Sequence, residues 1–445
     1  MKKAIFALLL IGLVGFSVVA SGCIGGGGGG KTSTTSSSPT KTSTEASGTG
    51  TTTQSPSQTA TSGQGYKGAI AIVYDVGGRG DLSFNDMAYL GASKAAKDFN
   101  LQLVELQSSS EDDYYKNLET LAKEKKYALI IAVGFMMTES VEAISKKYPD
   151  QKFAIVDGDV YDRPNVMSIK FKENEGSALA GALAALIAAN DNKNKVGIVL
   201  GMEIPVLYKF EAGYRFGVKW AEDYYKQKQG KDVSIDVIYQ YTGSFNDAAK
   251  GKAAADAQLQ DGAWVIYQVA GGTGLGVFNA VQEYLKSHGD KKMGPPFAIG
   301  VDSAQDWIKP GVIIASMMKR VDVGVYNAVK AALDGSFKGG ALELGLKEGG
   351  VKLSTVDDVM TMFNSLPEDR QKDKLKELGF NSKDELRQFL ENTRKQVPDW
   401  IWQAVDELQQ KIISGEIKVP APTNKDGIEK IRSAGTWQEM EQLAG

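Results

Sequence analysis

The sequence predicts an α/β protein of two domains, each built on a doubly wound parallel sheet. Between Tyr66 and Leu353, short apolar runs alternate with amphipathic helical stretches. This alternation is the pattern of parallel strands joined by helices that cover both faces of a sheet. The segment spans roughly 300 residues, more than one hydrophobic core usually serves, so two such domains are expected.

The first expected domain contains five apolar runs that we predict to be strands. They are short and separated by segments with helical spacing of apolar residues. The strands are Ala69 to Tyr74, Leu101 to Leu106, Ala128 to Val133, Phe153 to Val156 and Met167 to Phe171, and the helices are Ala88 to Phe99, Tyr114 to Lys125 and Ser140 to Tyr148.

The second expected domain repeats the alternation. Its predicted strands are Val196 to Leu200, Ile235 to Tyr239, Trp264 to Val269 and Phe297 to Val301, and its helices are Glu175 to Ala189, Lys209 to Lys226, Ala248 to Leu259 and Leu275 to His288. After Lys352 the pattern changes to charged amphipathic helices, at Glu368 to Leu378, Ser382 to Lys395 and Trp400 to Ile413. Their charge is typical of a solvated helix face and indicates no chemistry.

The N-terminal 23 residues have the layout of an export signal. Lys2 and Lys3 precede an apolar stretch from Ala4 to Ala20, which is followed by Ser21-Gly22-Cys23. Cys23 is the only cysteine, so no internal disulfide can form. Its place resembles a lipobox, in which the cysteine carries the lipid of an exported lipoprotein; a plain cleavage site or an uncleaved anchor is the alternative. We expect the rest of the chain on the outer face of the cell membrane.

Residues 24–65 are dominated by Gly, Ser and Thr, with almost no apolar residue. Such a composition cannot bury enough surface to offset the entropy of ordering the chain. We therefore predict a disordered stalk between the lipid anchor and the folded domains.

Two loops at predicted strand ends share one motif, Ser-Phe-Asn-Asp. Ser83-Phe84-Asn85-Asp86 lies in the first half and Ser244-Phe245-Asn246-Asp247 in the second. Ligands of doubly wound sheets bind beyond the carboxyl ends of the strands. A ring from each half could therefore hold a flat ligand between the domains. For one loop alone, a capped helix start with phenylalanine packed inward explains the residues as well.

Few features favour an enzyme or a nucleic-acid-binding protein. The only histidine, His288, ends a predicted helix, and no zinc-ligand spacing is present. Paired carboxylates, as in a glycosidase, remain an alternative because acids lie at the strand ends. With 51 Lys and Arg against 54 Asp and Glu, nucleic-acid binding has no electrostatic basis.

The glycine run from Gly271 to Gly276 lacks the context of a dinucleotide site, and we expect Gly271 and Gly272 to allow close backbone approach to a ligand.

Taken together, these strings resemble the basic membrane protein family of ABC-importer lipoproteins, which includes purine nucleoside receptors. The matching motifs are Gly80 to Tyr89, Val133 to Thr138, Lys152 to Gly158, Phe171 to Ser177, Gly201 to Pro205, Phe210 to Tyr214, Gly243 to Asp247, Val269 to Gly274, Ile299 to Ser303 and Ser316 to Asp322. They follow the order of the family from about Tyr66 to Leu353. The segment from Ser354 to Pro398 is longer than the usual tail of the family.

The resemblance implies a type I periplasmic-binding-protein fold, in which two lobes joined by three hinge crossings close on a ligand. The crossings would fall near Ile169 to Lys172, Met318 to Val321 and Gly349 to Leu353. Lobe 1 would comprise residues 66–170 and 320–350, and lobe 2 residues 171–319. Residues 351–445 would form a helical extension packed on the lobes.

The resemblance also implies roles for individual residues. Phe84 would stack on one face of a nucleoside base, and Asn85 or Asp86 would bind its edge. Phe245, and Phe210 with it, would close from the second lobe.

Three further residues complete the implied site. Asp157 would bind the base or the ribose, and Asp302 and Lys319 would take the ribose hydroxyls. Without the resemblance, Asp302 is equally well explained as a helix N-cap, and Lys319 beside Arg320 as a surface pair.

The implied function is capture of a nucleoside, with purines expected, for an ABC permease and its ATPase. No cofactor and no nucleic-acid partner is expected, and the protein would act as a monomer. A receptor for a sugar or another small solute, or a surface adhesin or sensor domain, remains the alternative.

Overall fold

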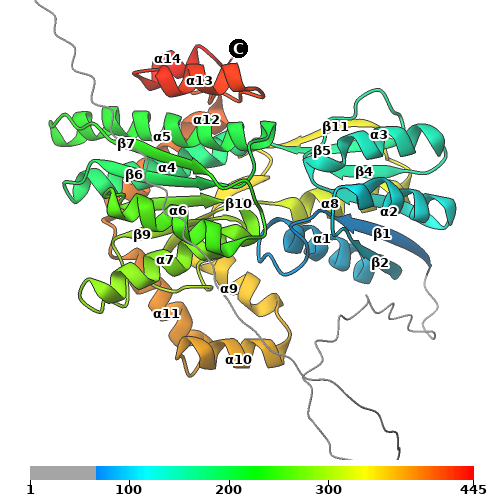
Figure 1. Cartoon of the computed structure of the whole chain (residues 1–445), viewed down its shortest axis with the longest axis horizontal. Coiled ribbons are helices and arrows are strands. Elements are labelled where there is room, and N and C mark those ends of the chain that lie inside the picture. Colours follow the sequence, from blue (N-terminus) through cyan, green and yellow to red (C-terminus); the bar gives the residue numbers. More distant parts are fainter. Residues whose placement is uncertain (1–66, 445) are drawn as a thin grey trace, which may run out of the picture. The chain divides into compact units, whose positions relative to one another are not determined.

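The structure is a computed structural model that describes residues 67–444 (Figure 1). The predicted signal peptide, the lipidation site Cys23 and the stalk lie outside the described residues. Two six-stranded sheets form the centre of two lobes. In the described part of the chain, no helix is long and apolar enough to cross a membrane.

The first lobe has an all-parallel sheet in the order β11-β5-β4-β3-β1-β2. Its strands are β1 (Gly68–Tyr74), β2 (Leu101–Gln107), β3 (Tyr127–Val133), β4 (Phe153–Val156), β5 (Val166–Phe171) and β11 (Gly340–Leu344). Helices α1 (Phe84–Phe99) and α8 (Val321–Asp334) pack together on one face, and α2 (Asp112–Lys123) and α3 (Thr138–Lys147) cover the other. The short helix η1 (Phe135–Met137) precedes α3.

The second lobe has the sheet order β12-β10-β9-β8-β6-β7. Its strands are β6 (Lys195–Leu200), β7 (Asp236–Tyr241), β8 (Val265–Val269), β9 (Phe297–Asp302), β10 (Ile313–Lys319) and β12 (Val351–Leu353). The long helices α4 (Glu173–Asn190) and α5 (Pro205–Gln229) pack on each other, as do α6 (Ala248–Gln260) and α7 (Gly274–Ser287), which η2 (Gly271–Thr273) precedes.

The chain passes three times between the sheets, which confirms the predicted fold class and hinge. It crosses at Lys172 between β5 and α4, at Arg320 between β10 and α8, and between Leu344 of β11 and Val351 of β12. All three crossings lie beside the carboxyl ends of strands, so the hinge and the expected ligand site are neighbours.

One expectation needs correction at the third crossing. Val351–Leu353 is not part of a helical extension but the edge strand β12 of the second sheet. It pairs antiparallel with β10, so the second sheet is not wholly parallel. The chain arrives there from the first lobe through a turn rather than a crossover helix, and antiparallel pairing needs no long connection.

The C-terminal helices pack on the second lobe. They are α9 (Val356–Ser365), α10 (Glu368–Leu378), α11 (Lys383–Arg394), α12 (Asp399–Ser414), α13 (Lys425–Ser433) and α14 (Trp437–Glu441). Phe363, Leu375 and Leu386 join the hydrophobic cluster of α7 and β9, whereas α12 packs on α4 and α13 and α14 on α5. Figure 1 shows the two groups on opposite sides of the lobe.

Candidate functional site

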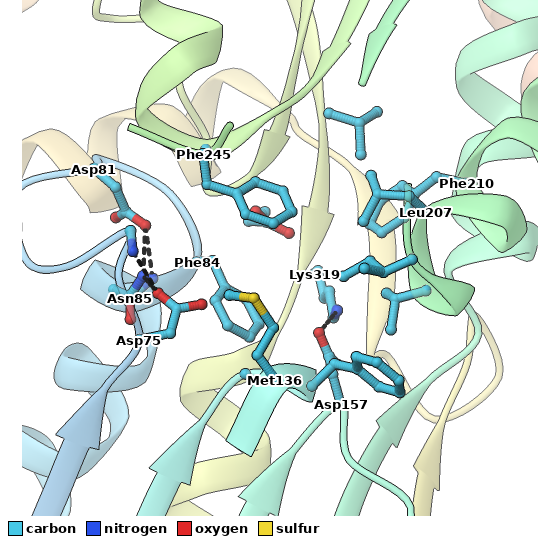
Figure 2. A pocket seen from close by; sticks show the side chains of 18 residues that line it. Asp75, Asp81, Phe84, Asn85, Met136, Asp157, Leu207, Phe210, Phe245 and Lys319 are labelled. Carbon is cyan, nitrogen blue, oxygen red and sulfur yellow. Dashed lines mark hydrogen bonds and ion pairs between the residues drawn. The ribbon is translucent and has the colours of Figure 1, made fainter. Parts of the chain in front are cut away.

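A narrow cavity lies between the lobes, at the carboxyl ends of both sheets (Figure 2). Its free volume is about 70 Å³. The first lobe contributes Asp75, Gly77, Asp81, Phe84, Asn85, Gly134, Phe135, Met136 and Asp157, and the second lobe Ile204, Val206, Leu207, Phe210, Phe245, Val269, Gly271, Asp302 and Lys319.

Phenylalanine rings enter this cavity from both lobes. Phe84 belongs to the first turn of α1, and Phe245 belongs to the loop between β7 and α6 on the facing lobe (Figure 2). Phe210 projects from α5. A Cβ atom at Gly201 would lie only 2.2 Å from the Phe245 ring, so the absence of a side chain there makes room for it. The structure therefore brings together the two Ser-Phe-Asn-Asp phenylalanines, and Phe84 lines the cavity rather than packing only inward.

Lys319 is a buried ammonium between two carboxylates. Its Nζ lies 2.6 Å from Asp157 Oδ2 and 3.0 Å from Glu173 Oε1. Its side chain is only 1% exposed, so the surface-pair alternative is wrong. Burial alone would lower the pKa of Lys319, but the carboxylates of Asp157 and Glu173 hold it above its usual value, and the group is charged.

Aromatic rings surround the same ammonium. Nζ lies 5.1 Å from the centroid of the Phe84 ring, 5.2 Å from that of Phe171 and 5.6 Å from that of Phe210. These distances permit cation–π attraction, and they place the cation directly beside the ring expected to stack on a ligand.

Asp302 closes the cavity from the second lobe. Its Oδ2 accepts a hydrogen bond of 2.7 Å from the Ser83 hydroxyl of the first lobe. Burial raises its pKa to about 6, although Lys319 opposes the shift. The residues after Asp302 form no helix, so the N-cap alternative is wrong.

Three polar residues form the opposite end of the cavity. Asn85 donates from Nδ2 to Asp75 Oδ1 at 2.9 Å and to Asp81 Oδ2 at 3.2 Å. Asp81 also accepts from the backbone N–H groups of Ser83 and Asn85, which fixes the first turn of α1. Burial raises the pKa of Asp75, and it raises that of Asp81 to about 7.

Two residues expected at the ligand do not line the cavity. Asp86 accepts from Arg79 Nε and from the backbone N–H groups of Gly80 and Leu82, and so it shapes the loop. The physical reason is that these loop donors already take its carboxylate. Gly272 lies one residue beyond the lining residue Gly271, in contact distance of the Phe245 backbone, where a Cβ would lie 3.2 Å from the Phe245 carbonyl oxygen.

Sequence reasoning missed other residues of the site. Asp75 and Asp81 lie in the loop after β1, and Met136 lies in the short helix η1 after β3. Their place directly beyond the ends of strands was the signal that could have found them. Leu207 lies in the first turn of α5 and gave no signal. Glu173 begins α4 inside a motif that matches the family, but its role depends on partners from distant segments. In residues 67–444, no group of three or more His, Cys, Asp or Glu side chains could hold a metal ion.

Comparison with known proteins assigns the chain to a family. Residues 69–387 match the family described as ABC transporter substrate-binding protein PnrA-like. An uncharacterized lipoprotein of Pyrococcus horikoshii is 40% identical over 431 residues, covering 96% of this chain and 95% of that protein. The ABC transporter nucleoside-binding protein BmpA of Lactococcus lactis is 36% identical over 299 residues, covering 64% of this chain and 80% of that protein.

A solved structure agrees with this assignment. The ABC transporter solute-binding protein of Aeropyrum pernix is 37% identical, with a TM-score of 0.73, and the alignment covers 84% of this chain and 99% of that one. Proteins of this kind bind solutes for transport and are not enzymes. The chain belongs to the PnrA-like family of ABC transporter substrate-binding proteins.

Proposed function

We propose that the protein captures nucleosides, purine nucleosides above all, outside the cytoplasm and delivers them to an ABC permease and its ATPase. In this proposal Cys23 carries a lipid that anchors the chain to the outer face of the cell membrane, and the protein acts as a monomer. The lipoprotein relatives and the nucleoside-binding relative support both parts of the proposal.

The observation that carries the proposal is a slot with rings on both walls and unpartnered acceptors at both ends. Phe84 and Phe245 enter from facing lobes, as a planar base requires. Asn85 Oδ1 at one end and Asp157 Oδ1 at the other are buried, and neither has a hydrogen-bond partner among the described residues. A buried acceptor without a partner is costly, so both atoms call for donors on a ligand.

Stacking on the two rings supplies too little free energy for tight binding, so the hydrogen bonds to the polar atoms of the slot must supply a large share. A ring pair contributes roughly 0.5–1.5 kcal/mol beyond its buried area, whereas micromolar binding needs about 8 kcal/mol. The ribose hydroxyls would donate to Asp157 and Asp302, and the base edge to Asn85. The Lys319 ammonium has three N–H groups. Two of them face Asp157 and Glu173, so the third is available to a ribose oxygen.

The test is a thermal-shift screen followed by calorimetry on protein unfolded and refolded to remove any bound ligand. Inosine, guanosine and adenosine should raise the melting temperature, because a ligand that binds only the folded protein stabilises it. 2′-Deoxyinosine should bind more weakly than inosine, since a missing hydroxyl leaves its partner unpaired. A response to pentoses alone would replace nucleosides with sugars, and no response to any solute would favour adhesion or sensing.

A ring truncation connects the binding to the slot. Phe84→Ala should weaken inosine binding about 10- to 100-fold, the range found when an aromatic ring stacked on a base is removed. Phe389→Ala, a half-buried ring on α11 far from the cavity, is the matched control and should bind inosine like the parent. Equal loss in both variants would mean that stability, not stacking, is being measured.

A further inference from the structure

The lobes also touch each other directly, through hydrogen bonds between their own residues. Ser83 of the β1–α1 loop donates its hydroxyl to Asp302 Oδ2, and its Oγ lies 3.3 Å from the Val301 carbonyl oxygen. Gln305 of the second lobe donates from Nε2 to the Leu82 carbonyl oxygen at 2.9 Å. These five residues are called the lobe contact below.

The lobe contact is buried. Ser83 and Gln305 are both 0% exposed. The Leu82 side chain, although it belongs to the first lobe, packs on the hydrophobic cluster of the second lobe. Its backbone has φ 51°, a left-handed conformation that a leucine adopts at a cost. Such strain persists only where surrounding contacts hold it, and here they come from both lobes: the Leu82 N–H donates to Asp86 Oδ2 of its own loop, and the Leu82 carbonyl oxygen accepts from Gln305 of the facing lobe.

The second lobe prepares Gln305 for this contact. Gln305 Oε1 accepts from the Val301 N–H at 2.9 Å and from Gln268 Nε2 at 2.7 Å. Gln268 is held in turn, since its Oε1 accepts from the Ala270 N–H. With the oxygen fixed by its own lobe, Gln305 presents its amide donor to the other lobe before the lobes meet.

We propose that Ser83 and Gln305 are positioning residues that favour the closed arrangement of the lobes with or without ligand. Because Phe84 follows Ser83 directly, the same contact sets the place of the Phe84 ring in the slot. The inference follows from the lobe-to-lobe bonds and does not rest on the identity of the ligand.

The fraction of ligand-free protein that is already closed affects how tightly the protein binds its ligand. A ligand binds the closed form more tightly, and its apparent affinity scales with the fraction of protein already able to adopt that form. Removing one bond of the lobe contact should therefore open the ligand-free protein and weaken ligand binding, although no ligand-contacting side chain is itself replaced.

The experiment measures the distance between the lobes in ligand-free protein. Cys23 is the only cysteine of the chain, so the full chain with Cys23→Ser accepts spin labels at two chosen sites. Lys116→Cys on α2 and Ala253→Cys on α6 are exposed and lie on different lobes. Pulsed electron spin resonance of refolded protein then gives the populations of short and long distances.

Two single variants probe the contact independently, so that a folding defect in one leaves the other informative. Ser83→Ala removes the hydroxyl. Gln305→Met, at similar volume, removes the amide donor to Leu82 and also the acceptor of two bonds inside the second lobe, which are lost in the open and the closed protein alike. Each should lower the ratio of closed to open protein about five- to tenfold, the effect of one buried hydrogen bond. Ser168→Ala is the matched control, because Ser168 is equally buried but bonds only to Val160 within the first lobe.

The expected result is a shift to longer distances in Ser83→Ala and Gln305→Met but not in Ser168→Ala. The proposal is overturned if the two variants keep the distance distribution of the parent, if the control shifts as they do, or if the ligand-free parent is already as open as the variants. None of these outcomes depends on nucleoside binding, so the proposed function can fail while this inference stands.

Discussion

Lys319 is the residue on which the two lobes, the hinge and the cavity meet. It ends β10, and its partners are Asp157 from the first lobe and Glu173 from the first turn after the first crossing. Two buried carboxylates share this ammonium, and the charge of Lys209 lies 3.6 Å from Glu173 Oε2. The cation is therefore structural as well as available to a ligand.

Lys319→Met should lower the free energy of unfolding by about 3–5 kcal/mol, because removing one partner of a buried ion pair leaves the other charge uncompensated. Adding Asp157→Asn should recover part of this loss, because Asp157 is paired with Lys319, whereas Glu173 keeps the ammonium of Lys209 nearby. Denaturant unfolding of both variants measures the difference. Lys97→Met, on the exposed side of α1, is the control and should behave like the parent. No recovery in the double variant would contradict the pairing.

Sequence could predict some site residues and not others, for physical reasons. Phe84 and Phe245 were predictable because one motif occurs at two strand ends. Glu173 was not, since its importance comes from an ammonium that the fold brings from a distant strand. Asp86 looked as suitable as Asn85, and only the loop geometry decides which of the two faces the cavity.

At the scale of elements, α4 and α5 pack so closely that glycines form their contact. A Cβ on Gly217 would lie 1.9 Å from the Ala178 carbonyl oxygen, and one on Gly181 would lie 2.0 Å from that of Tyr214. Both helices follow from apolar spacing in the sequence. The spacing does not predict which glycines permit the close approach, because that depends on the rotation of each helix about its axis.

Gly217→Ala should destabilise the protein by about 1–3 kcal/mol, the usual cost of overpacking, although alanine is the better helix former by roughly 1 kcal/mol. The reason is that the clash is with backbone, which cannot rotate away. Thermal unfolding followed by circular dichroism measures the loss. A rise in melting temperature would show that helix propensity outweighs the packing between α4 and α5.

Some of the C-terminal helices were predicted from the sequence, but the contacts that hold them on the second lobe were not. Charged amphipathic spacing gave α10, α11 and α12, but α13 and α14 are short and carry few apolar residues. Arg432 of α13 donates from Nε and Nη2 to the two oxygens of Glu211 on α5, at 2.9 and 2.7 Å. Glu211 is 0% exposed, and despite burial the guanidinium groups of Arg432 and Arg215 lower its pKa.

Arg432→Met should therefore cost about 3 kcal/mol of stability, because Glu211 would stay buried with one partner fewer. Arg387→Met is the matched control, an arginine of the same extension whose partner Asp357 is 83% exposed. Exposed pairs contribute little, so its unfolding should follow that of the parent. Similar losses in both variants, measured by denaturant unfolding, would argue against the attachment through Glu211.

At the scale of the whole molecule, the cavity between the lobes holds buried carboxyl groups that have no full set of charge partners. Burial raises the pKa of Asp75, of Asp81 to about 7 and of Asp302 to about 6. These groups come from both lobes and face one cavity. These carboxyl groups therefore hold their protons to a higher pH in the folded protein than in the unfolded chain, so the stability of the protein must depend on pH.

Since the buried Asp302 carboxyl holds its proton up to about pH 6 and the unfolded one only to about 3.8, the folded protein binds more protons in between. Its contribution to stability is then present below pH 3.8 and lost as the pH rises through 6. Asp302→Asn removes this loss, so its stability relative to the parent should rise by about 3 kcal/mol from pH 3.5 to pH 7.5, at roughly 1.4 kcal/mol per pKa unit. Denaturant unfolding across this range measures the difference, with Ser303→Ala, which removes no titrating group, as the control. A difference between Asp302→Asn and the parent that does not change with pH would mean that the Asp302 carboxyl has the same pKa in the folded and the unfolded protein, as a carboxyl in contact with water would.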